Sequence, residues 1–74
     1  MKIRNIGSNQ TEVQTPKCTV LVSYQTPVAA FLTDKMEYIR TSKKWSKTTS
    51  RHITKWLDGA KAVEVEQAVL DNLL

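Results

Sequence analysis

The stretch that decides the fold reads TVLVSY and occupies residues 19–24. Five of its six residues are β-branched, aromatic or leucine, a composition that suits the pleated, half-buried surface of a β-strand. The sequence QTP at residues 25–27 interrupts this strand, because proline lacks a backbone N–H and biases the preceding residue towards an extended conformation. We therefore expect a kink or tight turn here, followed by a second strand over residues 28–33.

Further strands are expected on both sides of this pair. Towards the N-terminus, residues 2–6 alternate in polarity as an edge strand does, and residues 11–15 return after a turn rich in Gly, Ser and Asn. Towards the C-terminus, a short loop leads into an antiparallel strand over residues 36–41. Successive side chains of that strand, such as Tyr38 and Ile39, are expected to face opposite sides of the sheet.

The second half of the chain predicts a main helix. Three apolar residues between Ile53 and Leu57 recur at the spacing of one helical face, and a hydroxyl side chain at residues 48–50 supplies the N-cap. Gly59 is well placed to end the helix in a left-handed cap. The helix is therefore expected over residues 49–58.

The remaining residues complete the predicted fold. Residues 60–65 alternate in polarity and form a short extended link, and residues 66–73 form a second, short helix with Glu66 at its positive end. We expect an α+β fold in a single domain, residues 1–74, whose β-rich part covers residues 1–41. Its small antiparallel sheet has three to four strands and is followed by one main helix and a short C-terminal helix on one face.

Charge is distributed unevenly along the chain, whose formal net charge is +4. Residues 40–56 include six basic side chains and no acidic one, whereas four of the five charged residues after Leu57 are acidic. Basic and hydroxyl side chains together suit phosphate oxygens, so this segment is a candidate polyanion-binding surface; a merely solvated charged face is the alternative. The candidate binding residues are Arg40, Lys43, Lys44, Trp45, Lys47, Arg51 and Lys55.

Four further residues have side chains of distinctive chemistry. Trp56 shares a helical face with Ile53 and is expected in the core. Trp45 stands in a polar loop, where stacking on a base, anchoring of a protein partner and folding back over the sheet edge are the alternatives. His52 has no metal or nucleophile partner and is expected to be structural or at the surface. Cys18 is expected to be a buried hydrophobe, with a reactive thiol or an intermolecular disulfide as alternatives.

The sequence lacks the parts of a catalytic or metal site. It has no glycine-rich phosphate loop, no CxxC pair and too few cysteine and histidine residues for structural zinc. We therefore expect a protein that is not an enzyme and that uses no cofactor or metal. No apolar run approaches the roughly 20 residues that span a bilayer, and the N-terminus lacks the apolar core of a secretory signal. A cytoplasmic protein without a membrane partner is expected.

Three segments are distinctive in combination. They are SYQTPVA at residues 23–29, YIRT and KWS within residues 38–46, and TTSRHI followed by KWL within residues 48–57. In this combination the chain resembles a family of small, uncharacterised proteins encoded by bacteriophages and prophages, over about residues 8–59. The resemblance implies an accessory protein that acts in the cytoplasm of an infected bacterium, and it implies no particular activity.

Three functional hypotheses follow. The first is a phage accessory protein that binds nucleic acid through the basic loop and helix. The alternative is a phage-encoded protein that inhibits or modulates a host enzyme or defence complex through a few aromatic and charged contacts. A third interpretation is a homo-oligomer, formed through edge strands at residues 2–6 or 36–41 or through a patch of Leu70, Leu73 and Leu74.

Overall fold

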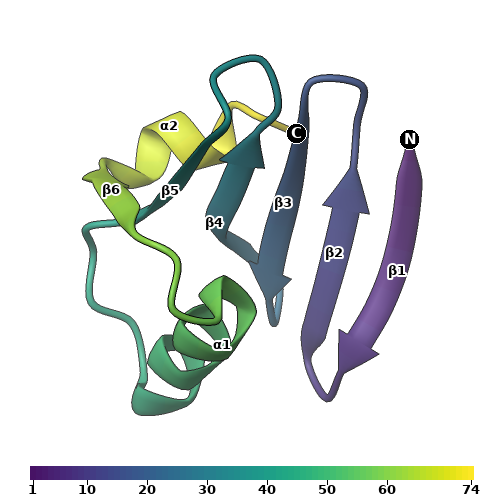
Figure 1. Ribbon diagram of the computed structural model, residues 1–74. Coiled ribbons are helices and arrows are strands. Elements are labelled where there is room, and N and C mark those ends of the chain that lie inside the picture. Colours follow the sequence, from purple (N-terminus) through teal and green to yellow (C-terminus); the bar gives the residue numbers. More distant parts are fainter.

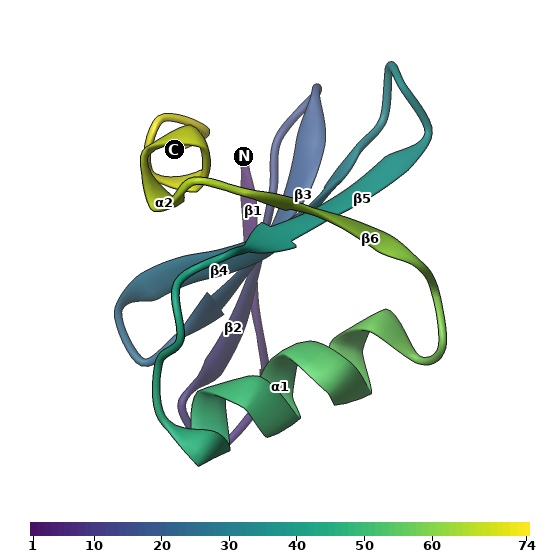
Figure 2. The same cartoon turned by 90° about the vertical axis from the view of Figure 1, so that its left-hand side faces the viewer.

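The computed structural model describes residues 1–74 and consists of one β-sheet with a helix on each side (Figures 1 and 2). The six strands lie in the sheet in the order in which they occur in the chain. The elements are β1 (Lys2–Gly7), β2 (Gln10–Gln14), β3 (Cys18–Ser23), β4 (Thr26–Leu32), β5 (Glu37–Thr41), α1 (Lys47–Leu57), β6 (Ala62–Val65) and α2 (Gln67–Asp71).

Strands β1 to β5 form an antiparallel meander, in which each strand pairs with the next along the chain. Short turns reverse the chain, and three of them contain a residue other than glycine at positive φ: Asn9 at 59°, Tyr24 at 59° and Met36 at 50°. Asparagine tolerates this left-handed conformation. For Tyr24 and Met36 it costs about 1–2 kcal/mol each, because the Cβ atom approaches the following carbonyl oxygen.

The sixth strand makes the sheet mixed. After the chain crosses over through α1, β6 pairs with β5 in parallel, with Val63 opposite Ile39. The predicted sheet of three to four antiparallel strands is therefore wrong, and residues 60–65 contain a strand rather than a link. The sheet dominates the molecule, which is not a balanced α+β fold. Because β5 lies between β4 and β6, residues 36–41 are also not an edge strand.

Two hydrophobic cores lie on opposite faces of the sheet, because successive residues of a strand point to opposite sides. On one face Val20 packs in a cluster with Leu70 of α2. On the other face Leu21 packs with Ile53 and Leu57 of α1. The two helices therefore cover opposite faces (Figure 2), and the prediction that both lie on one face is wrong.

Helix α2 is shorter than the predicted range 66–73, and its Leu70 is completely buried against the sheet. Leu70 is therefore part of the core and does not contribute to an exposed leucine patch. Cys18 is also buried in this core, as expected, and its thiol lies 3.3 Å from the Thr15 hydroxyl. Neither helix has the length and apolar character needed to cross a membrane.

Helix α1 begins two residues before the predicted range 49–58 and ends one residue before its end. Its N-cap is Ser46, whose side-chain oxygen accepts a hydrogen bond from the Thr49 N–H at 3.2 Å. The predicted caps at residues 48–50 instead lie within the helix. At the other end Asp58 adopts the left-handed conformation, and Gly59 follows at φ 87°.

Candidate functional site

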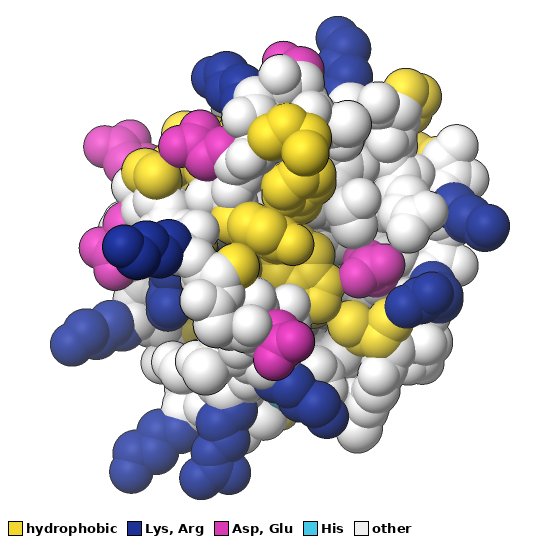
Figure 3. All heavy atoms as spheres, in the orientation of Figure 1, with side chains coloured by type: hydrophobic (Ala, Val, Ile, Leu, Met, Phe, Trp, Pro, Cys, Tyr) yellow, Lys and Arg dark blue, Asp and Glu magenta, His cyan; other side chains and the backbone are white.

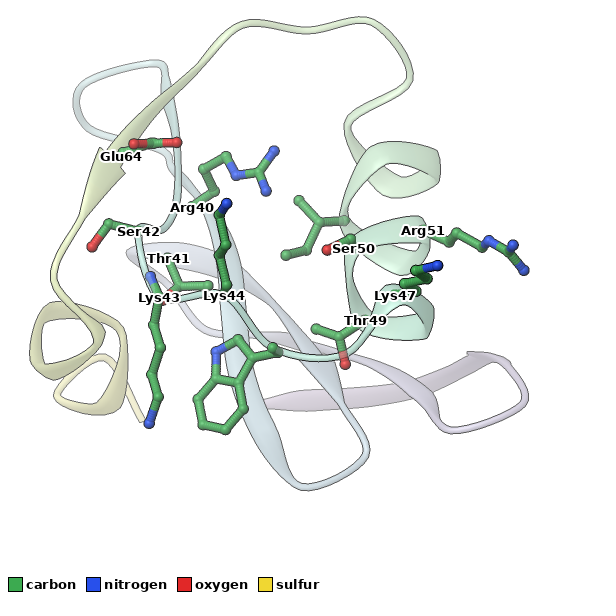
Figure 4. Close-up of a pocket in the computed structure, with 12 residues that line it drawn as sticks. Arg40, Thr41, Ser42, Lys43, Lys44, Lys47, Thr49, Ser50, Arg51 and Glu64 are labelled. Atoms are coloured by element: carbon green, nitrogen blue, oxygen red, sulfur yellow. The ribbon is translucent and has the colours of Figure 1, made fainter.

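A hollow of about 670 Å³ opens between β5, the loop that follows it and the first turns of α1 (Figure 4). We call it the basic hollow, because five basic side chains line it against one acidic side chain, Glu64. The basic side chains are Arg40, Lys43, Lys44, Lys47 and Arg51. Hydroxyl side chains of Thr41, Ser42, Thr49 and Ser50 supply much of the remaining wall.

The surrounding surface shows the same separation of charge as the sequence. In Figure 3, Lys and Arg side chains gather along the lower left of the face on which α1 lies. Acidic side chains on that side gather higher, towards β6 and α2. The start of α1 and the loop before it therefore form a positively charged end of the molecule, which attracts anions.

Arg40 is the basic side chain that the fold holds most firmly in this hollow. Its backbone is paired on both sides, with Ala29 of β4 and Glu64 of β6, and its side chain extends from β5 towards α1 (Figure 4). The Nε atom of Arg40 is buried and has no hydrogen-bond partner. A buried donor left unpaired costs about 1–3 kcal/mol.

The start of α1, which borders the same hollow, leaves backbone donors free. The first intrahelical hydrogen bond runs from the Ser50 N–H to the Ser46 carbonyl at 3.1 Å, which leaves the N–H groups of Lys47 and Thr48 outside the helical pattern. No acidic side chain occupies the first turn. The positive end of the helix dipole therefore reinforces the basic side chains around it.

Trp45 is fixed in place at the rim of the basic hollow, with its side chain 37% exposed. Its indole Nε1 donates a hydrogen bond to Gln67 Oε1 at 3.2 Å, and Gln67 Nε2 in turn donates to the Pro27 carbonyl at 2.7 Å. The Lys43 ammonium lies 4.3 Å from the ring centroid, in cation–π contact. The loop tryptophan is thus tied to the start of α2 and remains partly accessible.

A second hollow of about 270 Å³ adjoins the first, and we call it the aromatic hollow. The two hollows share Trp45 and Thr49 as wall residues. Tyr24, at the turn between β3 and β4, lines the aromatic hollow and is 51% exposed. Sequence reasoning did not include Tyr24 in the site. The only local signal was a large aromatic residue at a hairpin turn, where glycine or asparagine is usual.

Beneath the aromatic hollow lies a buried network of polar side chains. The Ser23 hydroxyl lies 2.8 Å from His52 Nδ1 and 3.1 Å from the Thr49 hydroxyl, and all three side chains are buried. The Tyr24 ring covers His52, with 6.0 Å between ring centroids. Because Ser23 is only 2% exposed and is bonded on both sides, this Ser–His pair anchors α1 to β3 and does not present a nucleophile.

Lys55 is the one predicted binding residue that does not line the basic hollow. It lies one turn further along α1, beside a different hollow that Arg4, Trp56 and Asp58 also line. Trp56 packs against the core on the α1 side, and its Nε1 donates a hydrogen bond to Glu12 Oε2 at 2.8 Å. The structure thus brings together the candidates from Arg40 to Arg51 and separates Lys55 from them.

No group of three or more His, Cys, Asp or Glu side chains in the structure could hold a metal ion.

No curated protein and no solved structure matches the chain. One family model matches it over residues 1–72, almost its full length. The chain therefore belongs to DUF8033, a family of unknown function.

Proposed function

We propose that this protein is a non-enzymatic phage accessory protein that binds nucleic acid in the cytoplasm of an infected bacterium. The binding surface is the basic hollow together with the first turn of α1. The observation that carries the proposal is the basic hollow itself, which five basic side chains, including Arg40, line against a single acidic one. A phosphate oxygen is the acceptor that such a group of donors suits best.

The distribution of these donors favours a phosphodiester chain over a single small anion. Lys47 and Arg51 point away from β5 along the outer side of α1, whereas Arg40 extends from β5 into the space between the two elements (Figure 4). Cations spread in this way would contact successive phosphates of a strand and release counterions from each. The start of α1 would contribute backbone N–H donors to one of them.

The test is fluorescence anisotropy of labelled DNA and RNA oligonucleotides at about 50 and 200 mM salt. The informative variant is Lys44→Gln with Lys47→Gln, and its control is Lys17→Gln with Lys35→Gln. Both pairs lower the net charge by the same amount, but the control residues lie in turns outside the basic hollow. We expect the first pair to weaken binding and to reduce the salt slope by about 1 for each phosphate contact removed.

The control pair should bind nearly as tightly as the wild type. Equal weakening by both pairs would mean that only the net charge of the protein matters, and would remove the basic hollow from the proposal. Absence of binding to every oligonucleotide at low salt would refute nucleic-acid binding altogether.

A second candidate function is binding to a host protein, and a specific surface favours it. Above α1, an apolar band lies on the face shown in Figure 3, and a row of partly buried aromatic rings lines the sheet on the α1 side. Phe31 and Tyr38 lie 4.7 Å apart, and Tyr38 and Trp56 lie 5.7 Å apart, measured between ring centroids. Such a row is typical of protein interfaces.

Pull-down from bacterial lysate with wild-type protein and with Phe31→Ser tests this candidate. A host enzyme or defence protein recovered in stoichiometric amount by the wild type and lost with Phe31→Ser would support it. The same recovery with both proteins would exclude the aromatic row as the contact surface.

A further inference from the structure

Two exposed aromatic side chains line the aromatic hollow, and the sequence places them more than 20 residues apart. Tyr24 comes from the turn between β3 and β4, and Trp45 comes from the loop before α1. They are 51% and 37% exposed. Aromatic side chains that share a hollow next to a phosphate-binding surface are the usual platform for an unstacked base.

Trp45 is held as a rigid platform. The hydrogen bond to Gln67 fixes the ring at its Nε1 edge, and the Lys43 ammonium covers one ring face at 4.3 Å. The residue nevertheless lines the aromatic hollow and is 37% exposed, so part of the ring remains accessible to a ligand. Because the side chain is already ordered by contacts within the protein, a base that stacks on it loses little energy to ordering the protein.

Tyr24 is held at its position at a cost in stability. Its φ of 59° lies in the left-handed region, which is unfavourable for a tyrosine and would be favourable for glycine or asparagine. Residues strained in this way cluster at active sites and ligand-binding sites. The ring lies over His52 and faces the same hollow as Trp45.

We propose that the aromatic hollow accepts one unpaired base of a single-stranded nucleic acid, stacked at Tyr24 and Trp45, with the adjoining phosphates in the basic hollow. This inference rests on the proposed function and narrows it to single strands. The volume of about 270 Å³ lies just below the range of drug-sized ligand sites and suits a group of the size of a base. Thr26 also lines the hollow, and a hydroxyl side chain can both donate a hydrogen bond to a base edge and accept one from it.

A duplex cannot use this site, because its bases are paired and stacked inside the helix. A single strand can place a base in the aromatic hollow while its backbone follows the positive surface. The chain should therefore bind single-stranded DNA or RNA more tightly than a duplex of the same length, although the duplex carries more charge.

The experiment compares three probes by anisotropy: a deoxythymidine oligonucleotide of about 12 nucleotides, the same strand with abasic linkers in place of the bases, and a duplex of equal length. The abasic strand keeps the phosphates and removes only the bases. We expect wild-type protein to bind the deoxythymidine strand about 5- to 150-fold more tightly than the abasic strand, the range that corresponds to stacking of one base.

The decisive variants are Tyr24→Asn and Tyr24→Phe. Tyr24→Asn relieves the backbone strain and removes the ring, so the protein should stay folded but show a clearly reduced preference for the deoxythymidine strand over the abasic strand, because only Trp45 remains to stack on the base. Tyr24→Phe keeps the ring and should retain the preference. Met36→Asn relieves strain at an exposed turn outside both hollows, and should change neither affinity nor preference.

The outcomes separate the two proposals. Equal affinity of the wild type for the deoxythymidine and abasic strands, or an unchanged preference in Tyr24→Asn, would overturn the base site and leave nucleic-acid binding intact. If the wild-type protein bound none of the three probes, both proposals would be overturned.

Discussion

Ser23 connects the sheet to α1 through a single hydroxyl group. It contacts both the Thr49 hydroxyl and His52 Nδ1, and all three side chains are buried. We expect Ser23→Ala to lower the free energy of unfolding by about 1–3 kcal/mol, because it leaves the buried His52 Nδ1 without this partner, while the Thr49 hydroxyl keeps its hydrogen bond from Ser46. Urea denaturation followed by circular dichroism measures this loss.

The matched control is Ser50→Ala, which removes an exposed hydroxyl from α1 itself. This change should alter the unfolding free energy by no more than about 0.5 kcal/mol. An equally small effect of Ser23→Ala would mean that the hydroxyl network contributes nothing to stability.

At the level of single residues, the sequence predicted where charge is concentrated better than it predicted which distant residues contact one another. The basic residues from Arg40 to Arg51 were predictable as a group, because they are close together in the chain and the surrounding elements keep them together. Tyr24 and Ser23 were not, since they reach the site from a strand end that only the tertiary fold brings beside Thr49. The environment of Trp45 depended in the same way on Gln67.

Among the elements, α1 depends on its N-cap. Ser46 bonds the Thr49 N–H, and its replacement by alanine leaves that group to water or without a partner. We expect Ser46→Ala to destabilise the protein by about 1 kcal/mol, and Ser46→Gly by only a few tenths of that amount. Thermal unfolding of both variants gives the comparison, and equal losses would show that Ser46 does not act as a cap.

The elements also show where sequence patterns stop being informative. The hairpins of the meander were largely predictable because neighbouring segments pair, although the reversal after β3 falls at Tyr24 and the expected interruption at Pro27 lies within β4. Strand β6 was not, because four residues with the sequence AVEV are compatible with a link, and their pairing with β5 depends on a crossover through α1. Which face each helix covers depends on that crossover too, so the prediction of one shared face failed.

At the scale of the molecule, α2 closes one of the two cores with few residues. Its Leu70 is completely buried among side chains from the sheet. We expect Leu70→Ala to cost about 2–5 kcal/mol, a large share of the stability of a chain this short, for which about 4–11 kcal/mol is typical. Val69→Ala, at a position 45% exposed, is the control and should be nearly neutral in urea denaturation.

The open sheet presents β1 as a free edge. Ile3 on this strand is 68% exposed, and the charged neighbours Lys2 and Arg4 oppose pairing with another copy. We expect Lys2→Thr with Arg4→Thr to increase self-association, measured by light scattering at rising concentration. The charge-matched pair Lys17→Thr with Lys35→Thr should not do so; equal association of both pairs would mean that net charge, and not the edge, controls it.

Because the two tryptophans lie in separate parts of the molecule, their intrinsic fluorescence can report on each part separately. Trp45 borders both hollows, whereas Trp56 lies at the far end of α1 against the core, bonded to Glu12. In a Trp56→Phe protein all indole emission would come from the site, so quenching by an oligonucleotide would report occupancy. In a Trp45→Phe protein the emission would follow core packing instead. Occupancy and unfolding could then be followed at separate positions without attaching a dye.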